Sequence, residues 1–105
     1  MLDEFYIEKL IKKKFPLKHS FFPTGIGDDA AVVKTNSNKL VISCDSQVEG
    51  VHFDLDYFTP EEIAFRSVSV ALSDLSAMGA KPKFFSNTLF IPKNINASFL
   101  NKLFN

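Results

Sequence analysis

The stretch that decides the fold is Leu40-Val41-Ile42-Ser43-Cys44-Asp45-Ser46-Gln47-Val48-Glu49-Gly50-Val51-His52-Phe53. Its first three residues are apolar, which predicts a strand buried on both faces. Residues 43–46 then place two hydroxyls, a thiol and a carboxylate at the carboxyl end of that strand, where open α/β sheets commonly bind ligands. Gly50 frees the backbone just before His52. Taken alone, the stretch fits a ligand site and a turn followed by a half-buried histidine equally well.

A second notable stretch, Gly25-Ile26-Gly27-Asp28-Asp29-Ala30-Ala31-Val32-Val33, comes before it. Two glycines permit a tight turn, and two adjacent acids follow where a strand over residues 30–34 is predicted to begin. Because neighbouring side chains of a strand point to opposite faces, one of Asp28 and Asp29 can face a cleft while the other caps a turn. On these residues alone, a Gly-Asp turn is the simpler interpretation. The glycine spacing matches neither the dinucleotide nor the P-loop fingerprint.

The polar segment 35–39 reads as a hairpin loop between strands 30–34 and 40–44, which would then be antiparallel neighbours. In such a hairpin the start of the first strand lies beside the end of the second. We therefore expect Asp29 to lie near residues 43–45, so that two groups of acids converge.

Helices are predicted on either side of this region. Asp3 is placed to cap a helix that runs to about Phe15. Thr59, with proline at the first helical position and Glu62 placed for a capping box, begins a longer helix that ends near Gly79. Its apolar face is the expected core stripe, formed by Ala64, Val68, Ala71, Leu72, Leu75 and Met78.

Asp74 is the exception on that helix. It lies late in the helix, where the macrodipole disfavours a negative charge, so it needs a partner. A solvated acid and a pair with Arg66 are the simpler interpretations. After the helix, residues 83–91 read as a strand, and a last helix capped by Asn94 or Asn96 is expected to reach the end of the sequence.

These elements predict an α/β (α+β) fold, with a mixed or antiparallel sheet and helices packed on one face. The 105 residues suit one domain, 1–105. Twelve Lys plus Arg balance twelve Asp plus Glu, which argues against a nucleic-acid or membrane partner. A single cysteine, an acidic amino terminus and no apolar run near the ~18 residues of a membrane span predict a cytoplasmic protein.

Three motifs, in this order along the sequence, are similar to those of a known enzyme family. They are residues 25–33, residues 43–53 with Val48-Glu49-Gly50-Val51-His52-Phe53, and Ala71-Leu72-Ser73-Asp74-Leu75-Ser76-Ala77-Met78-Gly79-Ala80-Lys81-Pro82. Together they resemble the amino-terminal domain of the thiamine-monophosphate kinase family. The helix-end motif is also similar to that of aminoimidazole ribonucleotide synthetase, selenophosphate synthetase and a hydrogenase maturation factor, and residues 48–53 favour the thiamine kinases within that superfamily.

The resemblance implies the amino-terminal fold of the aminoimidazole ribonucleotide synthetase-like enzymes and an ATP-dependent phosphorylation of thiamine monophosphate to thiamine diphosphate with Mg²⁺. Clustered carboxylates suit such chemistry, because two polyphosphates must be neutralised and aligned. The resemblance assigns substrate contact to His52 and no catalytic residue, while Asp28 is taken as structural. It assigns metal binding to Asp29, Ser43, Cys44, Asp45 and Asp74.

Cys44 departs from the family, which more often has threonine there, and a thiol is a poor ligand for Mg²⁺. We expect the backbone carbonyl to be the ligand. The family's second domain would lie beyond Asn105, so the chain alone is expected to be inactive, and by resemblance it forms a homodimer. The alternatives are another ATP-dependent enzyme of the superfamily and a non-catalytic dimerisation or metal-binding module.

Overall fold

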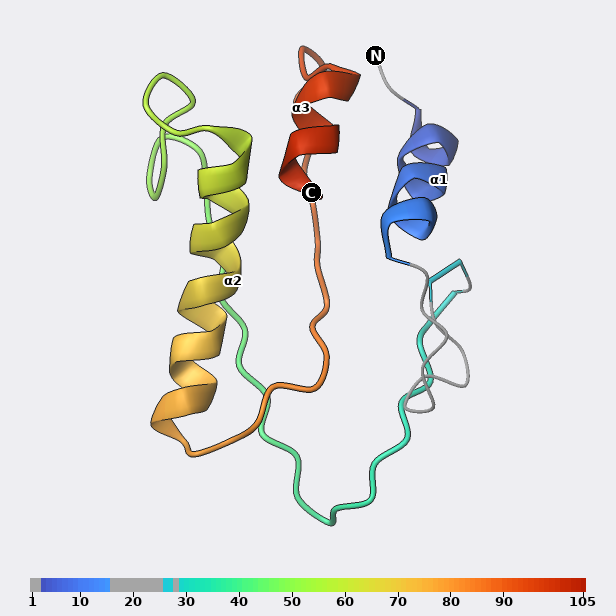
Figure 1. Cartoon of the computed structure of the whole chain (residues 1–105), viewed down its shortest axis with the longest axis vertical. Coiled ribbons are helices and arrows are strands. Elements are labelled where there is room, and N and C mark those ends of the chain that lie inside the picture. Colours follow the sequence, from blue (N-terminus) through green and yellow to red (C-terminus); the bar gives the residue numbers. More distant parts are fainter. Residues whose placement is uncertain (1–2, 16–25, 28) are drawn as a thin grey trace. The chain divides into compact units, whose positions relative to one another are not determined.

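The computed structural model describes residues 3–15, 26–27 and 29–105. The chain divides into two compact units, Met1–Leu40 and Val41–Asn105. The described residues form three helices: α1 (Glu4–Lys14), α2 (Pro60–Ala77) and α3 (Ala97–Leu103) (Figure 1). None of these helices has the length and hydropathy that would let it cross a membrane.

The first unit contains α1. The Asp3 carboxylate accepts a hydrogen bond from the Tyr6 backbone N–H at 2.7 Å and so caps the helix, as predicted. Glu8 and Lys12 form an ion pair one turn apart, with 2.6 Å between Oε1 and Nζ. Gly27 has φ 108°, and a Cβ there would lie 2.5 Å from Cε of Lys12. The positive φ favours glycine at this turn, whereas the flexible end of the Lys12 side chain could move aside for a Cβ.

The second unit contains α2, whose start is set by local contacts. Thr59 Oγ1 accepts from the Glu62 backbone N–H, and Glu62 Oε1 accepts from the Thr59 backbone N–H, each at 3.2 Å. The predicted capping box is thus confirmed, with Pro60 at the first helical position. Gly79, with φ 67°, follows the C-cap residue Met78. This positive φ explains why the helix stops at a glycine.

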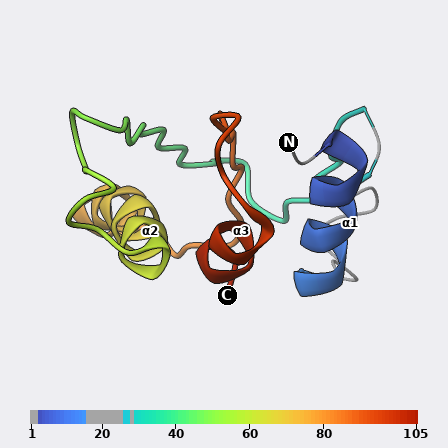
Figure 2. The ribbon, with the colours of Figure 1, turned by 90° about the horizontal axis from the view of Figure 1, so that it is seen from above.

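Helix α3 packs against α2 in this unit, and Figure 2 shows the two helices side by side. Asn96 is its N-cap, accepting from the Phe99 backbone N–H at 2.9 Å, and the helix ends at Leu103, before the end of the sequence. Among the described residues, the buried hydrophobic side chains are Ile63 of α2, 7% exposed, and Leu100 of α3, 1% exposed. The core thus lies at the amino-terminal end of α2.

The expectation of a buried stripe along all of α2 was wrong. Val68 is 40% exposed, Leu72 39% and Met78 71%. The reason is length: the seven residues of α3 cover about 10 Å, whereas the eighteen residues of α2 extend about 27 Å. Beyond its first turns, α2 has no second helix of this unit against which to bury its apolar side chains.

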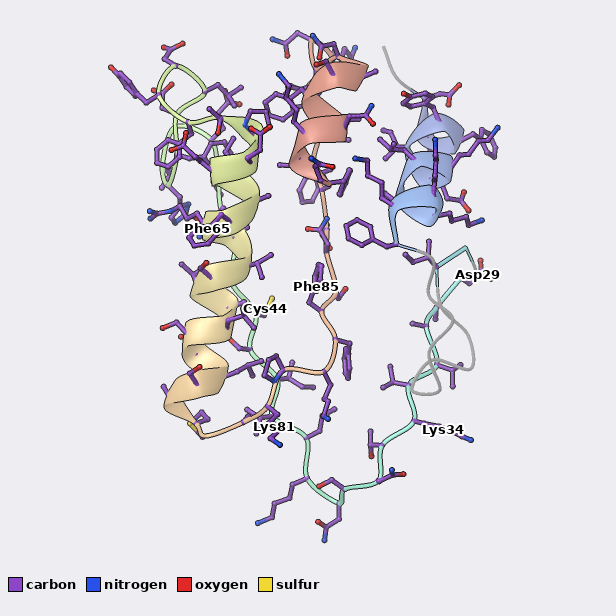
Figure 3. The ribbon with its side chains drawn as sticks, in the orientation of Figure 1. Asp29, Lys34, Cys44, Phe65, Lys81 and Phe85 are labelled. Carbon is purple, nitrogen blue, oxygen red and sulfur yellow. The ribbon has the colours of Figure 1, made fainter. Side chains whose placement is uncertain are left out.

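The predicted sheet is not confirmed. Residues 30–34, 40–44 and 83–91 form no strand in the described chain, and the hairpin over 35–39 is absent. A strand needs a continuous ladder of partners for its backbone N–H and C=O groups, and in the described chain these segments have no such ladder, only an isolated bridge at Val32. Their side chains are exposed accordingly, as with Ile42 at 77% and Phe90 at 90%. Figure 3 shows Phe85 on the drawn-out chain that follows α2.

Replacing Thr59 by alanine removes half of the capping box, so we expect the free energy of unfolding to fall by about 1 kcal/mol. Chemical denaturation read by circular dichroism measures this change. Thr88→Ala is the matched control, because Thr88 is exposed and caps no helix. An equal loss of stability in both variants would contradict the role given to the cap.

Candidate functional site

The candidate site is built on the segment of residues 43–47, which runs along α2 (Figure 1). At one end Ser43 Oγ donates to Asp74 Oδ2 at 2.8 Å, and at the other Arg66 Nε donates to Gln47 Oε1 at 2.9 Å. The two lengths match: four residues of extended chain span about 13 Å and eight helical residues about 12 Å. The segment therefore lies antiparallel to α2, and a hydrogen bond holds it at each end.

Asp74 has a partner, as its position late in the helix requires. That partner is the Ser43 hydroxyl, from a residue 31 positions earlier in the sequence. The alternative that Arg66 pairs with Asp74 is wrong, because the Nε–H of Arg66 is directed to Gln47. Asp74 is exposed and Ser43 is half-buried, so the pair brings two oxygen groups together where a ligand has access.

Asp45 lies between the two hydrogen-bonded ends of the segment. Its Oδ1 accepts from the Ser46 backbone N–H at 2.8 Å, a local contact that orients the carboxylate. Cys44 is an exposed free thiol on the same segment (Figure 3). The sequence placed Ser43, Cys44 and Asp45 together, and the structure adds that this group lies against the carboxyl-terminal half of α2.

His52 belongs to a tight turn and not to a strand. Its backbone N–H donates to the Val48 carbonyl at 2.8 Å, and its Nδ1 accepts from the Val48 N–H at 3.0 Å. Gly50, with φ 80°, donates to the Phe53 carbonyl at 2.7 Å and closes the turn. Because Nδ1 is an acceptor, the neutral ring carries its proton on Nε2. The exposed His52 thus offers an Nε2–H donor to a ligand.

Asp29 belongs to the first unit and the other predicted ligands to the second, so their convergence stays a prediction. Neither segment of the predicted hairpin, 30–34 or 40–44, forms a strand in the described chain. In the described part of the chain, no three His, Cys, Asp or Glu side chains are grouped to hold one metal ion. Asp28, which we took as structural, lies outside the described residues.

Gln47 and Arg66 were not predicted as parts of the site. A signal existed in the sequence, since Gln47 continues the alternation of Ser43 and Asp45 along an extended chain, and Arg66 precedes Asp74 by eight residues. Both pairs, Ser43 with Asp74 and Gln47 with Arg66, can form at this spacing only if the segment runs antiparallel to the helix. Their pairing is therefore visible only once the fold is known.

A shallow hollow of about 300 Å³ lies elsewhere in the second unit, at the start of α2 and α3. It is lined by Pro60, Asn94, Ile95, Asn96, Ser98, Phe99 and Lys102. Pro60 and Asp74 are fourteen residues apart on one helix, about 21 Å along its axis. The hollow is therefore separate from the candidate site.

Comparison with known proteins finds relatives that share one name. The chain is 44% identical to the thiamine-monophosphate kinase of Buchnera aphidicola subsp. Schizaphis graminum over 88% of this chain and 28% of that protein. It is 36% identical to the thiamine-monophosphate kinases of Bacillus subtilis and Aquifex aeolicus, over 98% of this chain and 32% and 31% of those proteins. No solved structure matches the chain.

The chain thus spans less than a third of the length of these relatives. Residues 27–105 match the family model described as AIR synthase related protein, N-terminal domain. That range contains residues 43–47, the turn of His52 and the whole of α2, which are the parts that form the candidate site. The chain belongs to the family of AIR synthase related proteins and carries their N-terminal domain.

Proposed function

We propose that residues 1–105 are the amino-terminal domain of a thiamine-monophosphate kinase. The complete enzyme transfers the γ-phosphoryl group of ATP to the phosphate of thiamine monophosphate and forms thiamine diphosphate. Support comes from relatives that carry this name and align over 88% to 98% of the chain. By itself the chain is inactive in this proposal, because the relatives are more than three times as long.

The observation that carries the proposal is the contact between Ser43 and Asp74. It joins two motifs that lie 31 residues apart in the sequence, at 2.8 Å between the oxygen atoms. A scaffold gains little from directing a serine to an exposed carboxylate, since an exposed hydrogen bond adds about 1 kcal/mol or less. For an enzyme that handles polyphosphates, the same contact holds an acid in a set orientation for a cation.

The residues present fit Mg²⁺, because the Ser43 hydroxyl and the Asp74 carboxylate meet and are hard oxygen donors, and Asp45 offers a further carboxylate on the same segment as Ser43. We propose Asp29, Ser43, Cys44, Asp45 and Asp74 as the ligand set, with Cys44 contributing its backbone carbonyl. Bound Mg²⁺ supplies neutralisation and alignment of the phosphate charges. The chain's own role is to hold these ligand groups in place, and ATP is the co-substrate.

His52 is the proposed contact to thiamine monophosphate. Its Nδ1 is occupied by the Val48 N–H, which leaves Nε2–H as a donor to an oxygen of the substrate. The turn of residues 48–52 holds the ring through its own backbone, because Val48 both donates to the ring and accepts from the His52 N–H. The donor is thus oriented before the substrate binds, which lowers the entropic cost of binding.

We further propose a cytoplasmic homodimer in which the sheet of the family is completed. Large apolar side chains are exposed on the extended segments, among them Ile42, Phe85 and Phe90. Exposed large apolar side chains of this kind suggest an interface. Pairing of residues 40–44 and 83–91 with further strands would satisfy their backbone groups and bury these side chains.

A second candidate is another ATP-dependent enzyme of the superfamily, because the matching family model covers AIR synthase related proteins in general. The two candidates differ in the acceptor and not in the metal site. A thermal-shift measurement on the complete protein distinguishes them: stabilisation by thiamine monophosphate in the presence of Mg²⁺ supports the kinase.

We expect Asp45→Asn to lower phosphoryl transfer to thiamine monophosphate in the complete enzyme by about a hundredfold or more. The carboxylate is lost from the middle of the proposed ligand set, so higher Mg²⁺ should be needed. Without Mg²⁺ the melting temperature should be unchanged or raised, because one of several like charges is removed.

Asp56→Asn is the matched control. It also removes one negative charge, but Asp56 is exposed and outside the proposed ligand set. Wild-type turnover in the Asp45→Asn enzyme, or an equal loss in the control, would show that Asp45 does not hold the metal.

Cys44→Thr tests how Cys44 binds the ion. If its backbone carbonyl is the ligand, we expect the Mg²⁺ concentration for half-maximal activity to change by less than about twofold. Activity measured against Mg²⁺ concentration provides the value. A gain of tenfold or more in Mg²⁺ affinity would mean that a side-chain hydroxyl is required at this position.

A further inference from the structure

Arg66 and Gln47 form a polar link between α2 and the candidate site. Arg66 is exposed on the helix, and its Nε–H donates to Oε1 of the half-buried Gln47 at 2.9 Å. The other end of the same amide, Nε2, donates to the carbonyl of Ser46 at 3.2 Å. Gln47 therefore accepts from the helix and at the same time donates to the backbone next to Asp45.

The link continues into the turn that carries His52. Val48 follows Gln47 directly, and its N–H donates to Nδ1 of His52 while its carbonyl accepts from the His52 N–H. A displacement of Gln47 would therefore move both the ring and the backbone of His52. Asp45 is affected on the other side, because its Oδ1 accepts from the N–H of Ser46.

In the described part of the chain, no other side-chain hydrogen bond ties the end of residues 43–47 to α2. Residues 43–47 are joined to α2 by two such bonds, Ser43 to Asp74 and Arg66 to Gln47. The first holds only the start of the segment. The contacts of Asp45 and His52 are local, so they shape the chain but do not tie it to the helix.

We propose that Arg66 is a positioning residue that acts through Gln47: it ties the end of residues 43–47 to α2 and thereby places Asp45 for the metal ion and His52 for the phosphate-bearing substrate. The ligands named here rest on the proposed function, while the mechanical link does not. Arginine suits the role because its Nε–H lies in the plane of a rigid guanidinium, whereas lysine offers a freely rotating ammonium group.

The first test is hydrogen exchange of the complete protein, read by mass spectrometry on peptides that cover residues 45–53. Gln47→Leu removes the acceptor with little change in size, and Arg66→Met removes the donor. Each should raise the exchange rate of these peptides about threefold to tenfold, as expected for the loss of one hydrogen bond. Peptides from the first half of α2 should exchange as in the unmodified protein.

Lys81→Met is the matched control for the lost positive charge, because Lys81 is exposed and lies after the helix. In this variant, peptides that cover residues 45–53 should exchange at the same rate as in the unmodified protein. Gln47→Glu keeps an Oε1 acceptor for the arginine and should restore most of the protection that Gln47→Leu loses. Failure of this rescue, or faster exchange in the control, would overturn the proposal.

The second test is kinetic and uses the double variant. Gln47→Leu and Arg66→Met should each raise KM for thiamine monophosphate about threefold to tenfold, with kcat less affected, and the double variant should be no worse than either single variant. Additive effects would mean that the two residues act separately. A large loss in Arg66→Met with no loss in Gln47→Leu would mean that Arg66 contacts the substrate itself.

The two proposals fail in different ways. If the unmodified protein does not phosphorylate thiamine monophosphate, the proposed function is wrong, and the exchange measurement still decides the role of Arg66. If the unmodified protein is active but exchange over residues 45–53 is the same in Gln47→Leu and Arg66→Met as in the unmodified protein, the positioning role is wrong and the proposed function stands.

Discussion

The candidate site depends on the attachment of residues 43–47 to α2. Two hydrogen bonds, from Ser43 to Asp74 and from Arg66 to Gln47, hold an extended segment antiparallel to a helix. Each ordinary hydrogen bond contributes only about 1 kcal/mol, yet the two act at opposite ends of a segment about 13 Å long. They therefore set the direction and register of the chain that carries Asp45, and through it the turn of His52.

This attachment is needed because apolar packing does not supply it. Buried hydrophobic side chains in the described chain are confined to Ile63 and Leu100, near the start of α2. At the other end of the helix, where Asp74 lies, Leu72 is 39% exposed and Met78 71% exposed. A seven-residue α3 is too short to cover that end. Polar contacts thus organise the site, and in our proposal a second copy of the chain completes the apolar packing.

The chemistry of the site follows from which atoms remain available. His52 uses Nδ1 within its own turn and presents Nε2–H, while Asp45 uses Oδ1 for the Ser46 N–H. In our proposal the oxygen atoms serve a hard cation and the Nε2–H serves a phosphate, as phosphoryl transfer requires. Ser43, Cys44, Asp45, His52 and Asp74 were predicted from the sequence, and the pairing of Asp29 with them stays a prediction. Gln47 and Arg66 were recognised only in the structure.

The sequence by itself determined the helix starts, because a cap involves residues no more than three positions apart: Asp3 with Tyr6, Thr59 with Glu62 and Asn96 with Phe99. It also determined the glycine turns at Gly50 and Gly79, where φ is positive. The partner of Asp74, the link from Arg66 to Gln47 and the absence of the predicted strands were decided by the tertiary structure. Each depends on a group 19 or more residues away, or on a strand partner, and local patterns carry no information on which distant group will be in reach.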